Sequence, residues 1–166
     1  MTLQLSRQAR RPAASQEAAV PIELPAVRIL IVDDDRAICD YMQTLLEKDG
    51  FAVKALSDPT LVEDEVRQGS YHVVILDLMM PKLDGIEVLK RIREHDTDVA
   101  VVVFTAHPNL DSAVAAMKLD AVDYIKKPFS VEEMLLAIER CLGDVRLRRE
   151  KDALTERLIQ SNRELQ

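Results

Sequence analysis

The chain has 166 residues, a formal net charge of −7 at pH 7 and two cysteines. Its length suits one domain of about 110–120 residues with extensions at both ends, and no apolar run approaches the roughly 20 residues needed to cross a membrane. Residues 27–142 carry 13 Lys and Arg against 22 Asp and Glu, a net charge of −9, so direct nucleic-acid binding is not expected. Cys39 and Cys141 lack metal-ligand spacing, and without a secretory signal they indicate a reduced, cytoplasmic protein.

Residues 1–26 open the chain without a regular hydrophobic pattern. Three prolines and few bulky apolar residues fall in this stretch, so we expect a disordered leader. The first strand is predicted from Arg28 to Val32, a buried aliphatic run. Three carboxylates, those of Asp33, Asp34 and Asp35, follow it directly.

Three further elements are predicted before the centre of the chain. A helix follows Asp35 and ends at Gly50, a residue suited to the left-handed conformation at a helix end. A strand is predicted over residues 51–55, and Asp58 followed by proline predicts the start of a helix that ends near residues 68–69. Asp35 is interpreted as a helix-start acid, favoured by the helix dipole, and is excluded from the functional site.

The central strand is a short run of buried residues. Val73 to Leu76 are all aliphatic and lead directly into Asp77, and Pro81 soon prevents further strand pairing. Ligands of open parallel sheets bind in the crevice outside the carboxyl ends of the strands, so Asp77 is a candidate functional residue. A helix is predicted over residues 86–95.

The fourth strand is predicted from Val99 to Phe104, and it ends in the hydroxyl of Thr105. The helix after it, from Leu110 to Leu119, is alanine-rich and weakly amphipathic. Small residues bury little apolar surface, so we expect this helix to be loosely held. Asp120 occupies the next turn, where aspartate tolerates a positive φ better than most residues but at a cost.

The last strand and the last helix complete the domain. A strand that begins at Ala121 ends in the ammonium of Lys127, just before Pro128. The helix after it begins with a capping box formed by Ser130 and Glu133. Its buried stripe reaches Leu142. Strand and helix thus alternate five times, which predicts an α/β fold with a doubly wound, five-stranded parallel sheet.

Residues 143–166 continue the helical pattern past Gly143, which predicts a C-terminal helical extension. Six positions on it follow alternating spacings of four and three, the seam of a coiled coil, but only about two and a half heptads are present. A solvated helical linker and a short coiled coil therefore stay open as alternatives. The seam reaches the end of the sequence without a cap, so we expect the chain to be cut from a longer protein. Its positions are Leu147, Lys151, Leu154, Leu158, Ser161 and Leu165.

Four of the predicted strands place polar groups at one edge of the sheet. The first strand ends in several acids, the central strand in one acid, the fourth in a hydroxyl and the last in a lysine. Carboxylates this close repel one another unless a cation lies among them, and a hard divalent ion with oxygen ligands fits best. This order resembles the receiver domain of bacterial response regulators. The resemblance covers residues 27–142, and it rests on the acidic pair and the LDLMMP, KLDG, TA and KKPF motifs.

The resemblance implies that Asp77 accepts a phosphoryl group from a histidine kinase or a phosphotransfer protein. It implies Mg²⁺ as the cofactor, held by Asp34, Asp77 and the main-chain carbonyl of Met79, and by Asp33 partly through water. Such a domain is not an enzyme for other substrates, because it assists only its own phosphorylation and dephosphorylation.

The resemblance also assigns the remaining site residues. Lys127 pairs with Asp77 and then with a phosphoryl oxygen, and Thr105 donates its hydroxyl to another. Phosphate draws Thr105 inward, Tyr124 turns into the space, and the surface of the fourth helix, fifth strand and fifth helix changes. His107 is either a residue that tunes the phosphoryl lifetime or a plain surface histidine.

The stretch from residue 112 to residue 124 is most similar to receivers of the nitrogen-regulation type, in which a helical linker leads to an effector. We therefore expect the switch to control an effector that is not visible in this sequence. We also expect a homodimer through the C-terminal helix and the face made by the fourth and fifth helices.

Two other functions fit part of the pattern. A Mg²⁺-dependent phosphohydrolase with an aspartyl nucleophile would use two acids two residues apart, as Asp33 and Asp35 are. This reading leaves Asp77 and its motif unexplained, and no downstream acidic motif supports it. A degenerate receiver that only mediates interactions is disfavoured, because the candidate residues are all intact.

Overall fold

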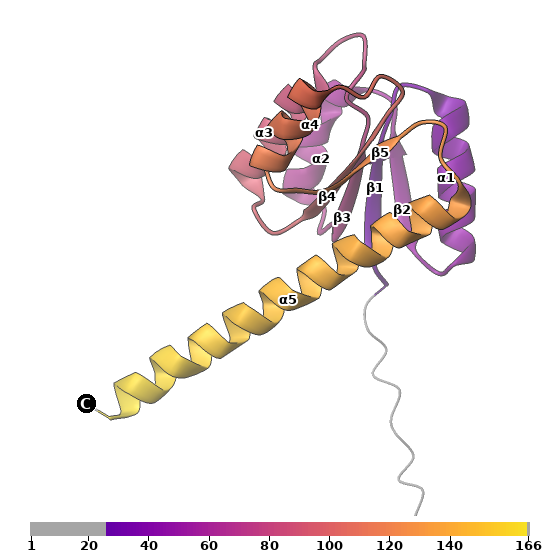
Figure 1. Cartoon of the computed structure of the whole chain (residues 1–166). Helices are drawn as coiled ribbons and strands as arrows, with labels where there is room; N and C mark the ends of the chain where they lie inside the picture. The colour runs from indigo at the N-terminus through magenta and orange to yellow at the C-terminus, as the bar shows by residue number, and fades with distance from the viewer. Residues whose placement is uncertain (1–25, 166) are drawn as a thin grey trace, which may run out of the picture.

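Five parallel strands and their helices form a three-layered α/β domain, and the computed structural model describes residues 26–165 (Figure 1). The sheet has the order β2-β1-β3-β4-β5, and the predicted doubly wound, five-stranded parallel sheet is confirmed. The predicted disordered leader, residues 1–26, lies outside the described residues apart from its last position. The strands are β1 (Arg28–Val32), β2 (Ala52–Leu56), β3 (Val73–Leu76), β4 (Ala100–Thr105) and β5 (Ala121–Lys126). The helices are α1 (Arg36–Lys48), α2 (Val62–Gln68), α3 (Gly85–His95), α4 (Leu110–Lys118) and α5 (Val131–Glu164), with a 3₁₀ turn, η1 (Pro59–Leu61), before α2.

Alternate residues of the central strands pack against helices on the two faces of the sheet. On one face, Ile29 and Ile31 of β1 join a buried cluster with residues of α1 and α5. On the other face, Leu30 and Val32 join residues of α2, α3 and α4. Because β1, β3 and β4 are buried on both faces, they read in the sequence as continuous aliphatic runs.

The predicted starts of β2 and β4 are each wrong by one residue, and hydrogen bonds explain why. The Phe51 amide donates to Leu46 of α1, so it closes the helix end, and Ala52 is the first residue that pairs with the sheet. The Val99 amide donates to the side chain of Asp96 and its carbonyl accepts from Arg93. Neither Phe51 nor Val99 is therefore free to start a strand.

Several predicted turns and helix ends are confirmed. Asp35 caps α1, Ser130 and Glu133 form the capping box of α5, and Gly50 has a φ of 89°. Asp120 has a φ of 59°, so the turn after α4 does require the left-handed conformation that aspartate tolerates. The helix predicted from Asp58 begins instead with the η1 turn, and the α-helix itself starts at Val62.

Helix α5 has 34 residues and runs through Gly143 without interruption (Figure 1). Arg148 joins this helix to the domain, because its guanidinium donates to the Thr97 carbonyl and pairs with Asp144. Every residue from 149 to 165 is exposed, so the end of α5 projects from the domain. Among the described helices, none combines the length and the apolar character that crossing a membrane requires.

Candidate functional site

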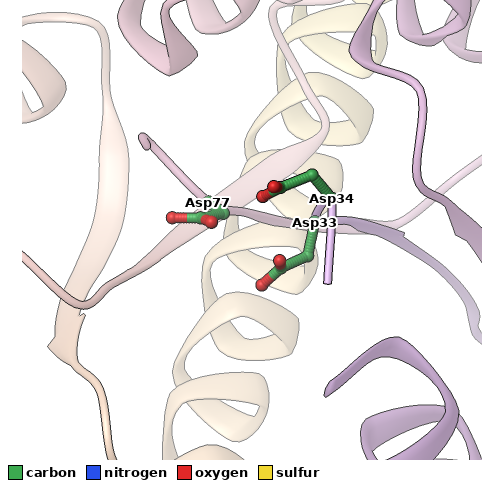
Figure 2. Close-up of side chains that lie close together, drawn as sticks. All are labelled: Asp33, Asp34 and Asp77. Atoms are coloured by element: carbon green, nitrogen blue, oxygen red, sulfur yellow. The ribbon is translucent and has the colours of Figure 1, made fainter. Parts of the chain in front are cut away.

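The candidate site begins with three carboxylates at the carboxyl edge of the sheet. Asp33 and Asp34 follow β1, Asp77 follows β3, and these strands are neighbours, with Val32 opposite Leu76. Each acid offers one oxygen within 4.8 Å of the other two (Figure 2). Asp33 and Asp77 are 2% and 5% exposed, whereas Asp34 is open to solvent. The structure thus brings together the three predicted metal-binding side chains.

Lys127 reaches this cluster from the end of β5. Its ammonium contacts Asp33 Oδ2 and lies 3.4 Å from Asp77 Oδ2. The lysine was predicted to pair with Asp77, and the structure shows a shared lysine whose shorter contact is to Asp33. The Lys127 amide also donates to the Thr105 carbonyl at 2.8 Å, which fixes the start of the β5–α5 loop beside β4.

Burial and neighbouring groups shift the pKa values of both partners of this ion pair. Loss of water around Asp77 raises the pKa of its carboxyl, with a smaller contribution from Asp33, although the Met79 amide and Lys127 act in the opposite direction. For Lys127, burial acts to lower the pKa, but the hydrogen bond and charge of Asp33, assisted by Asp77, outweigh it and the pKa is raised. The lysine therefore stays charged at neutral pH.

The donor set fits a hard divalent cation. At their formal charges, three aspartates and one lysine give the cluster a charge of −2, and one carboxylate oxygen of each aspartate lies within reach of a common ion. Asp33 is already engaged, since its Oδ1 accepts the Asp35 amide at 2.9 Å and its Oδ2 contacts Lys127. This agrees with an indirect contribution from Asp33.

The loop between β3 and α3 holds Asp77 and its neighbours in place. The Met79 amide donates to Asp77 Oδ1 at 3.1 Å, so the Met79 peptide lies next to the acid, while its carbonyl as a metal ligand stays a prediction. A Cβ at Gly85 would lie 2.3 Å from the Leu78 Cα and 2.6 Å from the Asp77 carbonyl oxygen. Only glycine lets α3 start so close to the backbone after Asp77, a requirement that the sequence motif contained but did not explain.

Thr105 ends β4 between the strands that carry Asp77 and Lys127. Its side chain is fully buried, and Oγ1 accepts the His107 amide at 3.3 Å, which leaves the hydroxyl proton available for another acceptor. His107 is exposed and lines an open groove of about 790 Å³ together with Asp34 and Met79. Its effect on phosphoryl lifetime stays a prediction.

Tyr124, the predicted switch aromatic, is half-buried on β5. Its hydroxyl lies 2.7 Å from the Ser112 hydroxyl on α4. Sequence reasoning missed Ser112, because a contact between a strand and the helix before it depends on how the helix packs over the sheet. The structure therefore shows Tyr124 attached to α4 by a hydrogen bond.

Asp35 does not join the acidic cluster as a catalytic partner. Its Oδ1 accepts the amides of Ala37 and Ile38, so its carboxylate serves the start of α1 as predicted. The phosphohydrolase reading needed Asp33 and Asp35 to work as a pair, and the cap hydrogen bonds give Asp35 another role.

The chain is similar to proteins of one family over most of its described length. The profile of the response regulator receiver domain matches residues 29–139. The uncharacterized transcriptional regulatory protein YkoG of Bacillus subtilis is 38% identical over 114 residues, which are 69% of this chain and 50% of that protein. The chain thus spans about half the length of the curated relatives it matches.

Solved structures agree with this assignment. NtrX from Brucella abortus is 30% identical with a TM-score of 0.72, over 78% of this chain and 30% of that one. The beryllofluoride-activated receiver domain of DrrB is 28% identical with a TM-score of 0.65, over 72% of this chain and 99% of that one. Fold, acidic site and sequence agree, and the chain belongs to the response regulator receiver domain family of two-component signalling.

Proposed function

We propose that this receiver accepts a phosphoryl group on Asp77 from a histidine kinase or phosphotransfer protein and acts as a phosphorylation-dependent switch. The observation that carries the proposal is a buried Asp77 that shares Lys127 with Asp33 and lies within 4.8 Å of two further carboxylates. A purely structural acid at a strand end has no need of a second buried acid and a largely buried lysine.

The transfer is a displacement at phosphorus. A carboxylate oxygen of Asp77 forms the new P–O bond, the P–N bond to the donor imidazole breaks, and the electron pair returns to the imidazole nitrogen. Asp77 must be ionised for this step. Burial raises the pKa of its carboxyl, which makes the carboxylate more basic and more nucleophilic than a solvated one.

The remaining residues hold charge around the transferred group. Asp34 and Asp77, with Asp33 partly through water and the Met79 carbonyl, would hold Mg²⁺, which supplies neutralisation of negative charge when bound. Lys127 is close enough to Asp77 to follow a phosphoryl oxygen after transfer. Thr105 keeps a free hydroxyl proton that can be donated to a second phosphoryl oxygen. The domain assists its own phosphorylation and dephosphorylation and transforms no other substrate.

The output is a change of the surface formed by α4, β5 and α5. Phosphate that draws Thr105 inward opens space beside β4, and Tyr124 on the neighbouring strand then leaves α4 to fill it. The altered surface controls a downstream effector, in keeping with the helical linker of nitrogen-regulation receivers.

A second copy of this chain is the partner that α5 fits. Leu147 lies nine residues, about two and a half helical turns, after the buried Ile138, so it faces away from the sheet. Leu147, Leu154, Leu158 and Leu165 are 58–82% exposed at coiled-coil spacing. A homodimer through this seam leaves the α4–β5–α5 faces beside each other, where phosphate can strengthen it.

Sedimentation of the full chain with Leu154 and Leu158 both changed to Glu tests this dimer. We expect a weak wild-type dimer at micromolar concentration, tighter with beryllofluoride, that the double variant lacks. Ile159→Glu is the matched control, because Ile159 is 50% exposed but lies off the seam. A wild-type chain that stays monomeric with and without beryllofluoride would leave a bare helical linker.

Acetyl phosphate with Mg²⁺ tests the phosphoacceptor. Mass spectrometry should detect an adduct of about 80 Da, one phosphoryl group, on the wild type but not on Asp77→Asn, a nearly isosteric change that keeps the fold. An adduct that remains on the variant would refute the assignment of Asp77. A wild type that takes no phosphate would instead support a degenerate receiver that serves only as an interaction module.

A further inference from the structure

Tyr124 is held on α4 by one specific contact. Its hydroxyl lies 2.7 Å from the Ser112 hydroxyl, and both side chains are half-buried. The backbone of Tyr124 is fixed independently, because the residue pairs with Val103 in the sheet. The contact therefore restricts the ring of Tyr124 and not its backbone.

The other bonds of Ser112 determine which hydroxyl donates. Ser112 Oγ donates to the Asn109 carbonyl at 3.1 Å, and a serine hydroxyl has a single proton. It must therefore accept the proton of the Tyr124 hydroxyl. The Ser112 amide also donates to the Asn109 side chain at 2.8 Å, so the acceptor stands in the first, capped turn of α4.

The same turn is joined to the phosphoacceptor site by a short loop. Thr105 accepts the His107 amide, and two residues later Asn109 begins the cap that holds Ser112. Helix α4 itself buries only Ala116 fully, and Leu110 at its start is 78% exposed. A displacement of Thr105 can therefore move the first turn of α4 at small cost in lost packing.

We propose that Ser112 is a positioning residue that holds Tyr124 on α4 in the unphosphorylated state and so sets how readily the receiver switches. This proposal rests on the proposed phosphorylation switch. It adds a residue that sets the equilibrium between the resting and the switched form in the absence of phosphate. A single hydrogen bond of this kind changes an equilibrium about threefold to tenfold. Its loss should raise the population of the switched form by that factor without phosphate.

Ser112→Ala removes the acceptor but keeps the backbone amide that completes the helix cap. Ser112→Thr restores a hydroxyl and should restore the wild-type balance. Thr44→Ala is the matched control, since Thr44 is an exposed helical residue whose hydroxyl, within residues 26–165, bonds only to the Asp40 carbonyl of its own helix. None of these residues belongs to the acidic site.

Two measurements on the full chain test the proposal. Carbon-13 labelling of tyrosine gives few ring signals, because the chain has three tyrosines and no tryptophan, and Tyr124→Phe assigns the relevant one. A beryllofluoride titration with Mg²⁺, followed through this signal, gives the concentration at half-saturation. We expect Ser112→Ala to move the free Tyr124 signal toward its beryllofluoride-bound position and to lower half-saturation about threefold to tenfold.

Recovery of both values in Ser112→Thr, with Thr44→Ala unchanged, supports the proposal. It is overturned if Ser112→Ala leaves the Tyr124 signal and the half-saturation at wild-type values, or if Thr44→Ala changes them equally. If the wild type binds no beryllofluoride, the proposed switch fails as a function. The free-state Tyr124 signal of Ser112→Ala and Ser112→Thr still decides whether Ser112 positions the ring.

Discussion

Replacing Lys127 with methionine tests whether the buried acids depend on one ammonium for their stability. At 3.4 Å and an effective dielectric constant near 20, the attraction between Lys127 and Asp77 is about 5 kcal/mol before the cost of dehydration. Asp33 adds a closer contact. Removing one partner of a buried pair leaves an uncompensated charge and typically costs about 3–5 kcal/mol. We therefore expect Lys127→Met to lower the free energy of unfolding by about that amount without Mg²⁺.

Urea denaturation at pH 7, with and without Mg²⁺, measures this loss. Saturating Mg²⁺ should recover part of it, because a bound divalent ion compensates the same carboxylates. Lys126→Met is the control, since Lys126 is exposed and its loss should change stability by less than about 0.5 kcal/mol. If Lys127→Met costs no more than this control in the absence of Mg²⁺, the charge argument for the site is wrong.

Asp34→Ala should weaken Mg²⁺ binding, measured by calorimetry. It should also raise the thermal stability of the metal-free fold, because it relieves repulsion among the acids. A marked fall in that stability would show that the acids do not repel one another in the folded state. Gly85→Ala should destabilise the fold by about 3 kcal/mol through backbone overlap. At Gly143, no atom of the described part of the chain lies within 4 Å of an added Cβ, so Gly143→Ala should instead stabilise the fold by about 0.5–1 kcal/mol in urea denaturation. Equal effects of the two substitutions would contradict the close approach of Gly85 to the backbone after Asp77. Because burial raises the pKa of Asp77 in the folded state, the native form binds more protons just above pH 3.8, so the contribution of Asp77 to stability falls as pH rises through the raised pKa. Asp77→Asn should abolish that part of the pH dependence in urea titrations.

The edge of the sheet that carries the site could be predicted because the functional residues directly follow the predicted strands in the sequence. Asp33, Asp77 and Lys127 each follow an aliphatic run, and parallel strands bring such ends together whatever the details of packing. The helix caps at Asp35 and Ser130 were equally accessible, because their hydrogen bonds are local in sequence.

Contacts that depend on packing could not be predicted in the same way. The preference of Lys127 for Asp33 over Asp77 depends on ångström differences between strands that are far apart in sequence. The bond between Tyr124 and Ser112 depends on the rotation of α4 above β5. The starts of β2 and β4 shift because helix-end and side-chain hydrogen bonds take groups that the sheet would otherwise use.

Because α5 is one continuous helix, a small rotation at its base causes a larger displacement at its projecting end. From Arg148, which contacts Thr97, to the helix end at Glu164 lie 16 residues, a length of about 24 Å at 1.5 Å per residue. A tilt of only about 10° at the base displaces the tip by about 4 Å over that length, roughly three quarters of the rise of a helical turn. In the proposed dimer, a small movement of the receiver surface would thus be sufficient to change which residues of the two α5 helices meet.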